Sequence, residues 1–126
     1  MEEEGPECRT LSLMHVLGKR WTIPVVEAIP AGRNGTSFNA IQQELGTITS
    51  KTLSKKLREL SSAGVIGRKE YRDNGASRIS YSFTKKGTAV RKFIRNVKEL
   101  GICLYGVEAG CVNRKCSTCP LSKPNH

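Results

Sequence analysis

The chain of 126 residues has little of what many enzymes need for catalysis. It contains only two histidines, His15 and His126, and no paired carboxylates of the kind used in acid–base chemistry. The segment GRNGTS at 32–37 lacks the lysine and the spacing of a phosphate-binding loop. We therefore expect that the protein is not an enzyme. The enzymatic alternative is a thiol oxidoreductase that uses Cys116 and Cys119, but the sequence does not predict the βαβ unit in which such a motif normally lies.

Long apolar runs are also missing. No run approaches the ~18 residues of a membrane-spanning helix, and the acidic start MEEEGPE differs from the basic-then-apolar order of a signal peptide. We therefore expect a cytoplasmic protein with no membrane partner. Thiols stay reduced in that compartment, so the five cysteines are better interpreted as metal ligands or redox groups than as structural disulfides.

Acidic residues are scarce in one part of the chain. The segment 51–98 holds 14 of the 21 Lys and Arg residues but only three of the 11 acids, so the net charge of +10 is concentrated there. Such a concentration favours a polyanionic partner, either nucleic acid or an anionic membrane surface. A well-solvated basic face is the alternative.

Apolar spacing predicts one mostly helical domain at 10–104, between a leader at 1–9 and a cysteine-containing tail at 105–126. Apolar residues that recur on one face predict helices, and alternation of apolar with polar residues predicts strands. The predicted helices are 10–17, 23–29, 38–45, 50–62 and 86–104, and the predicted strands are 65–73 and 78–84.

Capping and turn residues support these boundaries. We expect Thr22 and Ser37 to cap the second and third helices, and Gly64 to end the fourth in a left-handed conformation. Between the strands, Asn74-Gly75 favours a tight hairpin turn because both residues tolerate a positive φ.

Helix, four-residue turn, helix and hairpin, in this order, predict a winged helix-turn-helix of the α+β class, mainly α, with a two-stranded wing. This fold suits double-stranded DNA, because the second helix of the pair fits the major groove and the wing reaches phosphates or the minor groove. In helix 50–62, Leu53, Leu57 and Leu60 form an apolar stripe, and basic residues recur on the other side.

The predicted DNA contacts lie on this basic face and around the tip of the wing. We expect Lys51 and Thr52 to contact bases and the other basic residues of the helix to hold phosphates. A winged-helix adaptor that acts through protein–protein contacts is the alternative, and it has no need of this basic face. The predicted DNA-binding set is Ser50, Lys51, Thr52, Lys55, Lys56, Arg58, Arg72 and Arg78.

Three stretches carry a resemblance to a known family. GKRWTIPVVEAI at 18–29, SFNAIQQELGTITSKTLSKKLRELSSAGVIGRKEY at 37–71 and RISYSFTKKG at 78–87 resemble the HxlR family of winged helix-turn-helix regulators, relatives of the MarR group. The resemblance implies a homodimeric transcriptional regulator, paired through its first and last helices, that binds pseudo-palindromic operators. The last helix would then pair the two copies of the dimer. The alternative is that its apolar side chains cover the core of their own chain. Its apolar stripe is Val90, Phe93, Val97, Leu100 and Leu104.

The resemblance also implies a role for Cys8, which stands thirteen residues before Trp21. Many members of the family carry a cysteine at this place, and in several it senses electrophiles or oxidants. A thiol near a helix N-terminus is more reactive because the helix dipole favours its thiolate. Cys8 is therefore the predicted redox-sensing residue, and a cysteine that only packs against the dimer partner is the alternative.

The remaining cysteines form the pattern C-x7-C-x4-C-x2-C near the C-terminus. Four thiolates suit tetrahedral Zn2+ or an iron–sulfur cluster, although a zinc ribbon has two C-x2-C pairs and this chain has one. We expect either metal group to couple DNA binding to metal or redox state, with switchable thiol–disulfide chemistry and inert cysteines as alternatives. The predicted ligands are Cys103, Cys111, Cys116 and Cys119.

Overall fold

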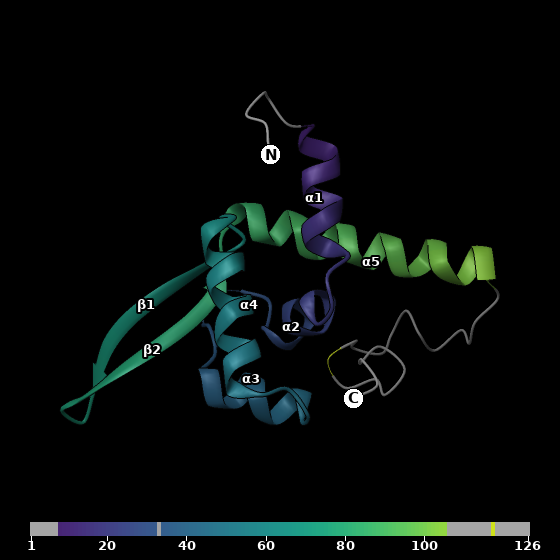
Figure 1. Ribbon diagram of the computed structural model, residues 1–126. Coiled ribbons are helices and arrows are strands. Elements are labelled where there is room, and N and C mark those ends of the chain that lie inside the picture. Colours follow the sequence, from purple (N-terminus) through teal and green to yellow (C-terminus); the bar gives the residue numbers. More distant parts are fainter. Residues whose placement is uncertain (1–7, 33, 106–116, 118–126) are drawn as a thin grey trace, which may run out of the picture.

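The computed structural model describes residues 8–32, 34–105 and 117. In these residues, five helices and one two-stranded antiparallel sheet follow one another in the predicted order, which confirms the mainly helical α+β class (Figure 1). Within these residues, no helix has both the length and the apolar character needed to cross a membrane. The elements are α1 (Arg9–Leu17), α2 (Thr22–Ala28), α3 (Phe38–Leu45), α4 (Ser50–Ser62), β1 (Ile66–Asp73), β2 (Ala76–Phe83) and α5 (Lys85–Tyr105).

The helix-turn-helix pair, α3 and α4, begins on side-chain caps. Ser37 caps α3, since its Oγ accepts a hydrogen bond of 3.1 Å from the backbone N–H of Ala40. Thr49 caps α4 in the same way by accepting from the N–H of Thr52. Each cap satisfies one of the N–H groups that a helix leaves free at its start, and the prediction for Ser37 is confirmed.

The end of α4 is a Schellman motif at Gly64. This glycine has a φ of 82°, in the left-handed region. Its N–H donates to the carbonyl of Ser61 at 3.1 Å, and the N–H of Val65 donates to the carbonyl of Leu60 at 2.9 Å. The predicted left-handed stop is confirmed, and it turns the chain directly into β1.

The predicted cap of α2 is wrong. Thr22 is the first residue of the helix, and its buried hydroxyl has no hydrogen-bond partner among the described residues. The N-cap is Trp21, whose φ of 73° is left-handed, whereas a serine or threonine cap adopts an extended backbone. Trp21 therefore makes the turn between α1 and α2, and its side chain is left half-buried at the edge of the core.

The wing is a hairpin that extends away from the helices (Figure 1). Its turn is Asn74-Gly75, with φ of 53° and 80°, as predicted. At its base, Thr36 and Tyr81 exchange two backbone hydrogen bonds of 2.8 Å. The segment before α3 thereby ties β2 to the helix-turn-helix pair.

The apolar core is built from α2, α3, α4 and the start of β1, with a contribution from α5. The predicted leucine stripe of α4 belongs to it, because Leu53, Leu57 and Leu60 are each 2% exposed or less. A leucine buried this completely contributes roughly 2 kcal/mol to the free energy of unfolding. The stripe fixes the rotation of α4 about its axis, so the opposite side of the helix faces solvent.

The junction between the wing and α5 is fixed by Thr84 and Gly87. The N–H of Thr84 donates to the carbonyl of Val65 at 3.1 Å, and Thr84 Oγ1 accepts a bond of 3.0 Å from the N–H of Gly87. A Cβ on Gly87 would lie 1.8 Å from the carbonyl oxygen of Val65, so no other residue fits without a shift of the backbone. These contacts explain the threonine and glycine of YSFTKKG, and they set the direction of α5.

The apolar stripe of α5 is divided between two surfaces. Ile94 is buried and Val90 half-buried against the core. An ion pair of 3.1 Å between Lys98 Nζ and Glu27 Oε1 also joins α5 to α2. One side of α5 thus covers the core of the domain, and another side leaves large apolar side chains exposed. The exposed ones are Phe93, Val97, Leu100 and Leu104.

Candidate nucleic-acid interface

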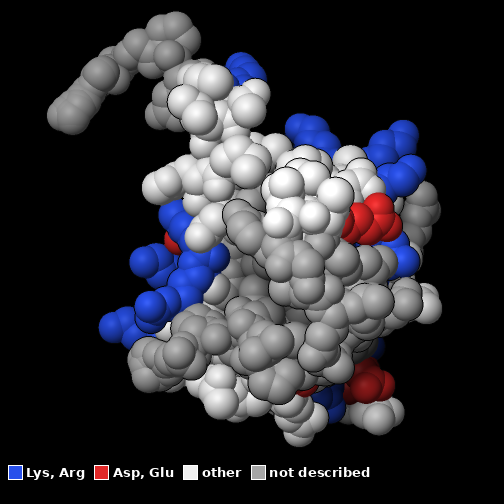
Figure 2. Space-filling model, turned by 90° about the vertical axis from the view of Figure 1, so that its right-hand side faces the viewer, with Lys and Arg blue, Asp and Glu red and all other residues white. Residues whose placement is uncertain are grey.

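The solvent-facing side of α4 carries most of the predicted helix contacts. Ser50, Lys51, Lys55 and Arg58 are exposed, and Thr52 is half-buried. In Figure 2, Lys and Arg side chains form one group along the left edge of the molecule and further groups on its right. Because the buried leucines hold the other side of α4, the exposed side chains of α4 project from a rigid support.

The turn that leads into α4 is braced by Gln42 of α3. Gln42 Nε2 donates to the carbonyl of Ile48 at 3.2 Å and to Ser50 Oγ at 3.0 Å. The hydroxyl of Thr49, which caps α4, also donates to Thr52 Oγ1 at 3.0 Å. These bonds orient the first turn of α4, the part of a recognition helix that reaches base edges. Sequence reasoning missed Gln42, because its partners come from the following turn and helix.

Lys56 is separated from the other basic residues of α4. Its side chain is buried, and its Nζ lies 3.2 Å from Oε1 of Glu59, one turn further along the helix. The ammonium group of Lys56 is not exposed in this conformation, so Lys56 cannot make the phosphate contact predicted for it. Lys56 instead faces a pocket beside α4, on the side away from solvent-exposed Lys51.

The two predicted wing residues, Arg72 and Arg78, are exposed but lie on opposite faces of the hairpin. Arg72 is the cross-strand partner of Ser77 and Arg78 that of Tyr71, and neighbouring pairs along a hairpin alternate between its faces. Arg72 Nη1 donates to the carbonyl of Gly75 at 2.9 Å and so supports the turn. A DNA surface that approaches one face of the hairpin therefore meets the guanidinium group of only one of these two arginines.

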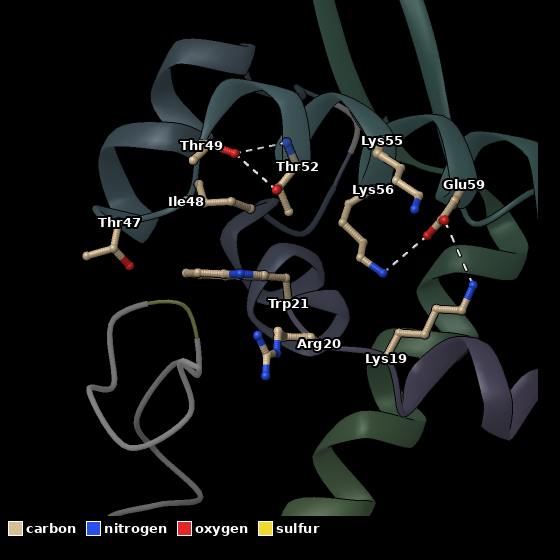
Figure 3. Close-up of a pocket in the computed structure, with 10 residues that line it drawn as sticks. All are labelled: Lys19, Arg20, Trp21, Thr47, Ile48, Thr49, Thr52, Lys55, Lys56 and Glu59. Atoms are coloured by element: carbon tan, nitrogen blue, oxygen red, sulfur yellow. Dashed lines mark hydrogen bonds and ion pairs between the residues drawn. The ribbon is translucent and has the colours of Figure 1, made fainter. Parts of the chain in front are cut away.

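A pocket of about 720 Å³ lies between the α1–α2 turn, the turn before α4 and α4 itself (Figure 3). Residues 19–21 line it from one side and residues 47–49 from another. The third side is α4, through Thr52, Lys55, Lys56 and Glu59. Sequence reasoning did not find this pocket, since its walls come from three separate segments.

One end of the pocket holds a cluster of charges around Glu59. Its Oε1 lies 3.2 Å from Lys56 Nζ, and its Oε2 lies 3.8 Å from Lys19 Nζ (Figure 3). Burial by itself would raise the pKa of Glu59, but the hydrogen bond from Lys56 and the charges of Lys56, Lys19 and Lys55 outweigh it and lower the pKa below its ordinary value. Glu59 is therefore a carboxylate at neutral pH, and it pairs with Lys56 of α4 and with Lys19 of the α1–α2 turn.

The cysteines are only partly described. Cys8 is the N-cap of α1, so it lies at the helix N-terminus as predicted, and its side chain is exposed. Cys103 is exposed near the end of α5. The predicted ligands Cys111, Cys116 and Cys119 lie outside the described residues. Within the described residues, no group of three or more Cys, His, Asp or Glu could hold a metal ion, so the metal site stays a prediction.

Helices α3 and α4, the hairpin after them and the covering helix α5 define a winged helix-turn-helix protein. The chain belongs to the HxlR-like helix-turn-helix family, which it matches over residues 16–106. This confirms the resemblance seen in the three sequence stretches. The protein is therefore a transcriptional regulator of the HxlR and MarR winged-helix type.

Individual relatives agree with this assignment. The chain is 31% identical over 100 residues to an uncharacterized HTH-type transcriptional regulator of Halalkalibacterium halodurans. The aligned residues cover 79% of this chain and 84% of that relative. It has the fold of the reduced transcriptional regulator YodB from B. subtilis, with a TM-score of 0.70, 23% identity, and coverage of 79% of this chain and 96% of that one. It is also similar to the redox regulator HypR in its reduced form, with a TM-score of 0.63, 25% identity, and coverage of 76% and 92%.

Proposed function

We propose that the protein binds a pseudo-palindromic DNA operator as a homodimer, and that oxidation of Cys8 changes this binding. The observation that carries the proposal is the two-sided α4. Its leucines are buried in the core, and Lys51, Lys55 and Arg58 are exposed on the other side. A helix held in this way presents its first turn to the major groove and its basic residues to the phosphates on either side.

The exposed apolar residues of α5 and α1 support the homodimer. On α5, Phe93, Val97, Leu100 and Leu104 follow one stripe and are between 38% and 64% exposed. Apolar side chains gathered in this way mark an interaction surface, and on α1 Leu11 is 68% exposed. A second copy of the chain would cover this surface and place two recognition helices about one DNA turn apart.

A duplex titration tests DNA binding. We expect the protein to bind the labelled duplex that lies upstream of its own coding sequence, with an affinity that falls linearly on a log–log plot against salt concentration. A scrambled duplex of the same length should bind about a thousandfold or more weakly. Binding that is indifferent to salt, or absent from every duplex tested, would contradict the proposal and favour an adaptor that acts through protein contacts.

The redox control is proposed for Cys8 because its thiol is exposed at the start of a nine-residue helix. The similarity to the redox regulator HypR points the same way. We expect diamide to change the duplex affinity of the wild type and to leave that of Cys8→Ser unchanged. Cys103→Ser, which removes the other exposed and described thiol, is the matched control. An equal response in wild type and Cys8→Ser would refute the role of Cys8.

The four-cysteine site is a separate proposal that the described residues do not test. Cys103 is exposed and so is accessible to a metal, and its three predicted partners are Cys111, Cys116 and Cys119. Anaerobic purification followed by metal analysis and a visible spectrum distinguishes zinc from an iron–sulfur cluster. A preparation with neither metal would end the proposal.

A further inference from the structure

Helix α2 connects the helix-turn-helix pair to α5. It contacts both α3 and α4, and it also contacts α5. Six of its seven residues are buried, and Glu27 is one of them. A short helix that is enclosed in this way does not shift by itself, because a shift would open gaps in a close-packed core. Helix α2 therefore helps to set the position of α5 relative to α4.

The contact between α2 and α5 includes a buried ion pair. Lys98 Nζ lies 3.1 Å from Glu27 Oε1, and the two side chains are only 10% and 11% exposed. Burial removes water from both charges, which is costly unless each ion stays close to the other. The hydrogen bond between them also depends on direction, whereas apolar contact does not. The pair thus fixes the orientation of α5 more strictly than the apolar packing of Ile94 does by itself.

The place of Lys98 along α5 makes this orientation important. Ile94, one turn earlier, is buried, whereas Leu100 and Leu104 are 55% and 64% exposed. This end of α5 extends past α1 and α2 (Figure 1). From Ile94 to Tyr105 the helix is roughly 16 Å long, at a rise of about 1.5 Å per residue. A tilt of about 10° at Ile94 would move the end of α5 by roughly 3 Å, which is close to the rise of one base pair.

In the proposed homodimer, the exposed part of α5 contacts the second copy. The tilt of α5 then sets the separation of the two α4 helices, and two-fold symmetry applies the same change to both copies. One extra base pair between two half-sites moves them apart by about 3.4 Å and turns one against the other by roughly 35°. A dimer with a fixed α5 should therefore accept few spacings, and a dimer with a loosely held α5 should accept more.

We propose that the Glu27–Lys98 pair determines which spacing between operator half-sites the dimer accepts. Both are positioning residues, since they act by holding α5 against α2 and neither belongs to the predicted DNA-binding set. The inference rests on the proposed dimer and on its binding to DNA, and it adds the residues that select the length of the operator.

Duplexes of altered spacing test this role. The starting duplex is the one upstream of the coding sequence, with its two half-sites located by footprinting, and one or two base pairs are added or removed between them. We expect each added or removed base pair to weaken wild-type binding about tenfold or more, because DNA or protein must be distorted to restore the match.

Two double variants change the pair itself. Glu27→Met with Lys98→Met should reduce the spacing penalty to about threefold or less per base pair, because an apolar pair fills the site without fixing a direction. Glu27→Lys with Lys98→Glu exchanges the two charges, and it should bring the penalty back toward the wild-type value.

Two controls separate positioning from charge and from stability. Lys92→Met removes an exposed lysine of α5 and should keep the wild-type penalty. A duplex with a single half-site should bind the double methionine variant as tightly as the wild type, because α4 itself is unchanged. An equal loss of affinity for the single half-site and for every spacing would mean that the pair only stabilises the domain, which overturns the inference.

The inference is also overturned if the double methionine variant, as a folded dimer, keeps the wild-type penalty, or if the wild type binds every spacing alike. If that variant does not form a dimer, Glu27→Gln decides, since it keeps the shape of the side chain and removes its charge. A wild-type penalty in Glu27→Gln would then overturn the inference. Failure of the proposed function is a different result, in which the wild type is monomeric or binds no duplex at any spacing.

Discussion

The two sides of α4 that carry lysine differ in what surrounds the ammonium group. Lys51 and Lys55 are exposed, whereas Lys56, the neighbour of Lys55, is buried and lies 3.2 Å from Glu59. A step of one residue turns a helix by about 100°, which is enough to move a lysine from solvent into a packed cluster. Burial and pairing, and not residue type, therefore decide which lysines of a basic helix can meet DNA.

The largest expected effect comes from the side of α4 that packs into the core. Leu57→Ala should lower the free energy of unfolding by about 2–5 kcal/mol, because it leaves a cavity beneath α4. Lys51→Ala, on the exposed side, should change it by no more than about 0.5 kcal/mol. Urea unfolding monitored by circular dichroism measures both. Equal losses would mean that α4 is not anchored by its leucine stripe.

A smaller effect separates the two adjacent lysines in DNA binding. Lys55→Ala should reduce the slope of log affinity against log salt by about 0.9 for each phosphate that the lysine neutralises. Lys56→Ala should leave the slope unchanged, since its ammonium is already neutralised by Glu59. Duplex titrations at several salt concentrations measure both slopes. A larger reduction from Lys56→Ala would show that this lysine leaves its pocket to bind DNA.

The smallest expected effect is the pH dependence of the Glu59 cluster. The pKa of Glu59 is lowered in the folded protein, so its ionised form stabilises the fold above the unfolded pKa, and this contribution is lost as pH falls through the folded pKa. At pH 7, Glu59→Gln should lower the free energy of unfolding by less than about 1 kcal/mol. The difference from wild type should shrink below about pH 4.3, the ordinary glutamate pKa. A difference that grows on acidification would contradict the ion cluster.

Most features set by local sequence could be predicted, although the cap expected at Thr22 was wrong. The leucine spacing indicated the rotation of α4, and the Asn74-Gly75 turn placed the wing, because each depends on residues within a few positions of one another. The same holds for the cap at Ser37 and the stop at Gly64.

Features that depend on distant partners were missed or only partly found. Lys56 looks like any other basic residue of α4 until Lys19, from the α1–α2 turn, joins it at Glu59. The stripe of α5 looks like one apolar face in the sequence, but contact with the core separates buried Ile94 from exposed Phe93.

The opposite faces of Arg72 and Arg78 follow from the register of the hairpin. Counting outward from the Asn74-Gly75 turn would have given this register from the sequence.

The most direct test of the account compares two double variants that remove the same charge. Lys51→Ala with Arg58→Ala takes one lysine and one arginine from the exposed side of α4, and Lys92→Ala with Arg95→Ala takes the same pair from exposed positions of α5. The measurement is the salt dependence of binding to the upstream duplex. We expect the α4 variant to bind more weakly, with a slope reduced by about 0.9 for each phosphate no longer neutralised, and the α5 variant to keep both affinity and slope. Equal reductions in the two variants would show that net charge alone attracts DNA and that α4 is not the recognition helix.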